Sequence, residues 1–168
     1  DLPEFAALGR RGVRLLLSDS TNAEVPGFVA SESSLAQPLY EIVVETKGRL
    51  IAACFASHIH RVQQIVDAAV DAGRYVAFMG RTMLRNVPTA EELGLFSVPE
   101  DRVLPLEELL RLPPGDAAIV CTGSQGEPFA AMSMMAAGQH RWVQVGEGDT
   151  VLISARPIPG NETKVSRV

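Results

Sequence analysis

Five times along this chain, a short apolar run ends in a small polar turn that opens a helix. The runs are unalternated, as in 15–17 and 117–120, which suits parallel strands covered by helices on both faces. The turns are 18–22, 57–61, 80–82, 122–128 and 154–161. Parallel strands end at one edge of a sheet, and open α/β sheets bind ligands there. The sequence therefore predicts that its unusual chemistry gathers at one edge.

The alternation of segments predicts an α/β fold, a doubly wound and mainly parallel sheet flanked by helices. Strands are expected over 12–18, 50–55, 75–79, 117–121 and 151–154. Helices are expected over 31–47, 59–72, 81–93, 105–112 and 128–137. Ser31 or Ser33 is the expected cap of the first helix and Ser57 of the second, while Pro88 should interrupt the third and Thr89 start a short new one.

Composition narrows the function classes. The 168 residues suit one domain, and 46% hydrophobic with 21% charged residues is ordinary for a globular chain. No apolar run approaches the ~18 residues of a membrane span, and no basic stretch is followed by an apolar core, so we expect neither a secretory signal nor a membrane partner. The net charge of −5 argues against a grip on nucleic acid by the whole surface, but leaves room for a local basic cleft.

Cys54 and Cys121 lie near the ends of apolar runs, where a buried thiol is expected rather than a disulfide. This predicts a reduced, cytoplasmic setting. No Cys-x-x-Cys or His-x-x-x-His pair indicates a metal site. The chain begins with Asp1, and the residues after Asn161 read as a helix that has just begun, so we expect a piece of a longer polypeptide.

Asp19 follows an apolar run within Ser-Asp-Ser-Thr. A carboxylate there can orient a histidine, accept a proton or bind a metal. A local Asx-turn or helix cap explains the same residue more simply.

The turn 57–61 gathers Ser57, His58, Ile59, His60 and Arg61 at the start of a helix, whose N-terminal amides favour anions. A histidine there can hydrogen-bond a phosphate or a base edge, and Arg61 adds charge. The alternative is a capped helix with solvent-exposed histidines. A zinc site is the weaker option, because a third ligand is not apparent.

In the turn 122–128, Gly123 and Gly126 let backbone amides approach an anion, although the lysine of a Walker loop is missing. A flexible tight turn fits as well. Arg156, in the last turn, can reach a phosphate. As given, the chain contains no complete catalytic apparatus.

Four segments, in order across nearly the whole chain, resemble the bacterial ribonuclease J family of metallo-β-lactamase/β-CASP nucleases. They are LLLSDSTNAE (15–24), FASHIHRVQQ (55–64), CTGSQGEP (121–128) and PIPGNE (157–162). The resemblance implies a β-CASP domain over 23–168, without the C-terminal part of the full protein. It implies that 1–22 is the edge of a metallo-β-lactamase domain and ends in motif A. At position 58, many relatives carry asparagine instead of histidine.

The resemblance implies a 5′-to-3′ exoribonuclease with endonuclease activity, active in RNA maturation and decay. Its zinc would be held by the metallo-β-lactamase domain, so we expect no cofactor in this segment and no activity of the segment alone.

The resemblance also implies roles for individual residues and partners. Asp19 matches the motif A acid, Ser57 to Arg61 match a segment that contacts RNA near its 5′ end, and Gly123, Ser124 and Gln125 line the same cleft. The implied partners are single-stranded RNA with a 5′-monophosphate, the metallo-β-lactamase domain of the same chain and, in the full protein, a second copy in a homo-oligomer. The residues alone also allow a non-catalytic α/β module that binds a nucleotide or a protein at the same edge.

Overall fold

A computed structural model describes residues 2–20 and 23–168. The chain divides into two compact units, residues 1–30 and residues 31–168, and the sheet lies in the larger one. Among the described residues, no helix has both the length and the apolar character that crossing a membrane requires.

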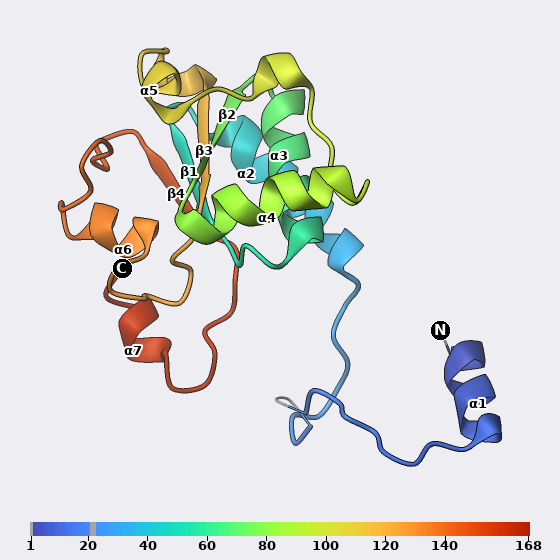
Figure 1. The fold of residues 1–168 in the computed structure, drawn as a ribbon. Helices are drawn as coiled ribbons and strands as arrows, with labels where there is room; N and C mark the ends of the chain where they lie inside the picture. The colour runs from blue at the N-terminus through green and yellow to red at the C-terminus, as the bar shows by residue number, and fades with distance from the viewer. Residues whose placement is uncertain (1, 21–22) are drawn as a thin grey trace. The chain divides into compact units, whose positions relative to one another are not determined.

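The sheet has four strands, all parallel, in the order β2-β3-β1-β4 (Figure 1). They are β1 (Leu50–Ala53), β2 (Tyr75–Met79), β3 (Ala117–Cys121) and β4 (Thr150–Ile153). Ala53 lies opposite both Cys121 and Ile153, and Cys121 lies opposite Met79. The strands therefore end level with one another, and the predicted parallel α/β fold is confirmed.

Helices cover both faces of the sheet (Figure 1). The helical segments are α1 (Leu2–Arg11), η1 (Glu32–Leu35), α2 (Ala36–Glu45), α3 (Ile59–Asp71), α4 (Arg81–Glu92), η2 (Glu100–Arg102), α5 (Leu106–Leu109), η3 (Pro114–Asp116), α6 (Ala131–Ala136) and α7 (Glu162–Val165). Alternate residues of a strand face opposite sides. In β1, Leu50 and Ala52 pack with α2, α3 and α4, whereas Ile51 and Ala53 pack with α5 and α6. Burial on both faces explains why the strand sequences do not alternate.

Cys54 and Cys121 are free and buried, as predicted from their positions at the ends of apolar runs. Burial raises the pKa of Cys54 to about 12 and also raises the pKa of Cys121. Both thiols therefore stay protonated at neutral pH and act as core side chains.

The predicted break at Pro88 is wrong, because α4 runs unbroken through it. Proline removes one backbone donor. Met83, Val87 and Ala90 nevertheless stay buried and hold the helix to the core, and Thr89 Oγ1 donates to the carbonyl of Arg85 instead of capping a new helix.

The smaller unit contains α1, which the sequence patterns did not predict, and the predicted strand over 12–18 does not form. Leu15, Leu16 and Leu17 are 73%, 74% and 86% exposed, and no described strand pairs with them. A strand is stable only when another strand satisfies its backbone and covers its apolar side chains. The described part of this unit offers no such partner.

Arg74 stabilises the amino end of the sheet, where α2 leads into β1. It is a charged residue, yet only 4% of its surface is exposed. Its guanidinium donates to the carbonyls of Thr46 (2.5 Å) and Gly48 (2.8 Å), and more weakly to those of Val43 and Ala117 (both 3.4 Å). Burial lowers its pKa, while the charge of Asp116 opposes that shift. Arg74 thus satisfies the last carbonyls of α2 where the chain turns into β1.

We expect Arg74→Met to lower the free energy of unfolding by about 2–4 kcal/mol, because several buried carbonyls lose their donor. Urea unfolding measures this. Arg85→Met is the matched control, since Arg85 is exposed and its guanidinium bonds only the side chain of Asn86 among the described residues; it should change stability by less than about 0.5 kcal/mol. Equal effects of the two changes would contradict this role of Arg74.

Candidate functional site at the carboxyl edge of the sheet

The turns that follow β1, β2 and β3 line a cleft of about 580 Å³ at the carboxyl edge of the sheet. Its lining comprises residues 54–57, 79–82, 122–124, 127–131, Met134 and His140. The turn after β4 leaves the same edge, because β4 runs parallel to β1 and in register with it. Four of the five polar turns thus lie at one edge, as the sequence predicted. The fifth, which contains Asp19, lies in the smaller unit, and its residues 21–22 are outside the described residues.

The N-terminus of α4 opens at this cleft, and no side chain of the described residues caps it. Gly80 is its N-cap, with φ at +104°, and a Cβ there would collide with the side chain of Thr122. Glycine thus lets the end of β2 approach the turn after β3 closely. The first-turn N–H groups and the positive end of the helix dipole favour an anion at this position.

Arg81, the first residue of α4, lines the same cleft and is exposed. Its guanidinium makes no ion pair or hydrogen bond with another described residue. Ser57 and His60 are also exposed, at the start of α3; Ser57 lines the cleft, whereas His60 lies in the same turn but outside the lining.

His58, and not Ser57 as predicted, caps α3. Its Nδ1 accepts the backbone N–H of Arg61 at 3.3 Å, so its remaining proton is on Nε2, which lies 3.6 Å from a carboxylate oxygen of Glu32. The imidazole nitrogen does here what the side-chain oxygen of an asparagine does at an N-cap. The role of the histidine at this position is therefore at least partly structural.

Arg61, predicted to add charge at the site, is held by residues of the protein itself. Its guanidinium forms a two-point ion pair with Glu32, through Nε to Oε1 and Nη2 to Oε2. Its Nη1 donates to the carbonyl of Ser154 at 3.0 Å and to its Oγ at 2.8 Å. Arg61 thus ties the start of α3 to η1 and to the end of β4, and most of its donors are already engaged.

The hydrogen bonds from Arg61 hold the pKa of Glu32 below its ordinary value. Partial burial raises the pKa and works against this, while the charge of Arg61 lowers it further. The carboxylate therefore stays ionised at neutral pH and keeps Arg61 in place.

Gln125 is a second tie, between the turns after β3 and β4. Its side chain is 3% exposed; Nε2 donates to the carbonyl of Arg156 at 2.9 Å, and Oε1 accepts the N–H of Ile158 at 2.7 Å. Ser124 is also buried. Gly123 has φ at +112°, and a Cβ there would come within 3.0 Å of the backbone nitrogen of Met132. The turn is thus tightly built, and Gln125 supports the edge from inside.

Two residues of the cleft were missed by the sequence patterns. Phe129 lines the cleft, and 91% of its surface is exposed. The only sign of this site in the sequence was an aromatic residue directly after Pro128. His140 also lines the cleft, and its Nδ1 accepts the backbone N–H groups of Trp142 (3.4 Å) and Val143 (3.2 Å). Burial lowers the pKa of His140, so the ring is neutral and carries its proton on Nε2.

Within residues 2–20 and 23–168, no three side chains of His, Cys, Asp or Glu come together as a metal site would require. The described residues therefore do not fit a zinc ion among themselves. The cleft offers helix amides, hydroxyls and the cation of Arg81, together with the carboxylate of Glu127, which accepts the backbone N–H of Gln125 at 3.1 Å.

Comparison with known proteins decides the family. Residues 47–168 match the model of the family described as ribonuclease J, beta-CASP domain. The chain belongs to the ribonuclease J β-CASP domain family. Over 165 residues, or 98% of its length, the chain is 46% identical to ribonuclease J of Mycolicibacterium smegmatis. Over its full length it is 46% identical to ribonuclease J 1 of Streptococcus pyogenes. Ribonuclease J of Thermus thermophilus is 44% identical over 167 residues.

The chain spans about 30% of the length of these ribonuclease J relatives. The resemblance in its four sequence segments is thus confirmed at the level of the family and the domain.

The Glu32–Arg61 ion pair predicts a pH dependence. Because the folded-state pKa of Glu32 is depressed, its contribution to stability is present above the ordinary glutamate pKa and is lost as pH falls through the folded value. The wild-type protein should therefore be more stable than Glu32→Gln near pH 6, and the difference should shrink towards about pH 3. Urea unfolding at several pH values measures it. A difference that stays constant or grows on acidification would contradict the assignment.

Proposed function

We propose that this chain is the RNA-binding β-CASP domain of a zinc-dependent ribonuclease J, which degrades and matures RNA as a 5′-to-3′ exonuclease and as an endonuclease. The cleft at the carboxyl edge of the sheet binds single-stranded RNA that carries a 5′-monophosphate. The observation that carries this proposal is the N-terminus of α4 together with Arg81, neither of which is bonded by a side chain of the described residues, inside the cleft of a ribonuclease J domain.

The chemistry of the cleft suits a nucleic-acid strand. Phosphate oxygens accept hydrogen bonds from helix N-termini, hydroxyls and guanidinium groups, which α4, Ser57, Thr82 and Arg81 supply here. Phe129 offers an exposed ring at the same cleft, and bases stack on such rings without sequence preference. The net charge of −5 is compatible with RNA binding, because the positive charge that would attract a phosphate is local, on Arg81 in the cleft.

Within this proposal, the predicted site residues divide by their contacts. Ser57 and His60 are proposed to contact RNA, and the backbone at Ile59 and Gly123 to lie along it. His58, Arg61, Ser124 and Gln125 hold these groups in position, because their own polar atoms are bonded or buried within the domain.

The zinc ions and the attacking water belong, in this proposal, to the metallo-β-lactamase domain of the same protein. When bound, zinc ions lower the pKa of a water molecule and so supply the nucleophile. Asp19 is proposed as a supporting acid of that domain, and residues 1–22 as its edge. The exposed leucines 15–17 support this, since they need a neighbouring sheet to cover them. The 168-residue chain alone is then inactive.

We further propose that the protein works in the cytoplasm and that copies of the full-length protein can assemble into a homo-oligomer.

The competing function is a non-catalytic α/β module that binds a nucleotide or a protein at the same edge. Cleavage of RNA by the 168-residue chain alone, after a chelator has removed metal ions, would contradict the division of labour between the two domains.

RNA binding by variants of the full-length protein tests the cleft. We expect Arg81→Ala to weaken binding of 5′-monophosphorylated single-stranded RNA about tenfold, the cost of one charge-assisted hydrogen bond to phosphate. The slope of log affinity against log salt should fall by about 0.7. His60→Ala should weaken binding severalfold. Fluorescence anisotropy with a labelled oligonucleotide measures all three.

Arg85→Ala is the matched control, an exposed arginine one turn further along α4 that does not line the cleft. It should leave binding unchanged. Arg61→Ala should lower both RNA affinity and the melting temperature, whereas Arg81→Ala should lower affinity alone. If Arg81→Ala and His60→Ala bind RNA as the wild type does, the non-catalytic module becomes the better function.

A further inference from the structure

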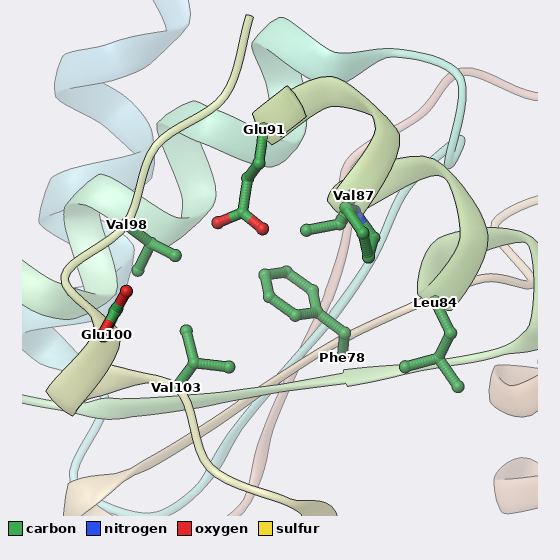
Figure 2. Close-up of a pocket in the computed structure, with 8 residues that line it drawn as sticks. Phe78, Leu84, Val87, Glu91, Val98, Glu100 and Val103 are labelled. Carbon is green, nitrogen blue, oxygen red and sulfur yellow. The ribbon is translucent and has the colours of Figure 1, made fainter. Parts of the chain in front are cut away.

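A second pocket, of about 290 Å³, lies between α4 and the segment 98–103, which runs beside β2. Figure 2 shows its interior: Phe78 from β2, Val87 from α4, and Val98 and Val103 from the segment that follows. These side chains point towards a common space. Phe78 also makes an edge-to-face contact with Phe96, with the ring centres 6.0 Å apart. The floor of the pocket is therefore apolar and packed against the core.

Two carboxylates stand at this pocket, Glu91 on α4 and Glu100 at the start of η2 (Figure 2). Both residues are exposed. Neither carboxylate makes an ion pair or a hydrogen bond with any other described residue. The pocket therefore presents negative charge from two separate elements around an apolar centre, and none of the described residues that line it is a cation.

This pocket is distinct from the RNA cleft, since the two share no lining residue. Its charge also excludes the same ligand, because two unpaired carboxylates repel a phosphate backbone. The complement of the pocket is an apolar group accompanied by positive charge.

We propose that this pocket binds a short basic segment of a partner protein, in which one large apolar side chain fills the space above Phe78 and a lysine or arginine on each side of it pairs with Glu91 and Glu100. The volume is at the lower limit of pockets for small molecules, which run from about 300 to 1,000 Å³. It suits a single anchoring side chain, the usual core of a small interface. The two carboxylates lie on different elements, α4 and η2. A peptide with a cation on each side of its apolar residue can pair with both, whereas a small amine has only one charged end.

The test uses the full-length protein without RNA and a fluorescein-labelled pentapeptide, Gly-Arg-Phe-Lys-Gly. Its two matched peptides are Gly-Glu-Phe-Glu-Gly and Gly-Arg-Ser-Lys-Gly. Anisotropy titrations should show saturable one-to-one binding of the first peptide, at least tenfold tighter than of either control. Its affinity should fall as salt rises, because the rim pairs are exposed.

Variants locate the binding. The double variant Glu91→Gln with Glu100→Gln should weaken the first peptide about tenfold, and substitutions at these exposed positions leave the core intact. Glu92→Gln is the control, because Glu92 is the neighbouring exposed carboxylate on α4 and does not line the pocket. Equal binding of the three peptides, or an unchanged affinity in the double variant, overturns the proposal. Tighter binding of 2-phenylethylammonium than of the first peptide also overturns the proposal, since the pocket would then be a site for a small cation.

Discussion

The in-register parallel pairing of β1 with β3 and β4 is the constraint on which the rest of the molecule depends. Because Ala53 lies opposite both Cys121 and Ile153, the strands β1, β3 and β4 end at the same level in the sheet. Met79 of β2 ends level with Cys121 as well. Every turn that carries polar chemistry in the larger unit therefore begins from one line. A strand that slipped by one residue would exchange its two buried faces and move its turn out of this line.

Two side chains, Arg61 and Gln125, connect these turns to one another and to the rest of the domain by hydrogen bonds. Arg61, anchored by Glu32, holds the end of β4, and Gln125 joins the turns after β3 and β4. Their polar groups are used within the domain, which leaves the outward-facing groups, such as Arg81 and the first amides of α4, for a ligand. The edge thus separates residues that hold the surface from residues that face outward.

Much of this could be predicted from the sequence, for a physical reason. The run 117–121 is buried on both faces, so its lack of alternation identified it as a parallel strand with its bounds correct. The role of Arg61 could not be predicted, because its partners are 29 and 93 residues away in the chain, and local spacing carries no information about them. The run 12–18 has strand-like residues but no partner strand among the described residues, and a pattern alone does not supply one. The cap of α3 was misassigned because serine is the commoner N-cap, whereas here the imidazole of His58 reaches the amide of Arg61.

The central claim is that RNA lies along the carboxyl edge of the sheet, and amide hydrogen exchange of the full-length protein tests it most directly. Exchange is compared with and without a 5′-monophosphorylated single-stranded RNA too short to be cleaved. We expect slower exchange in the segments 57–61, 80–83 and 122–126, which begin at that edge. Unchanged exchange in all three segments, with protection instead at the opposite edge over 46–49, 72–75 and 113–117, would contradict the claim.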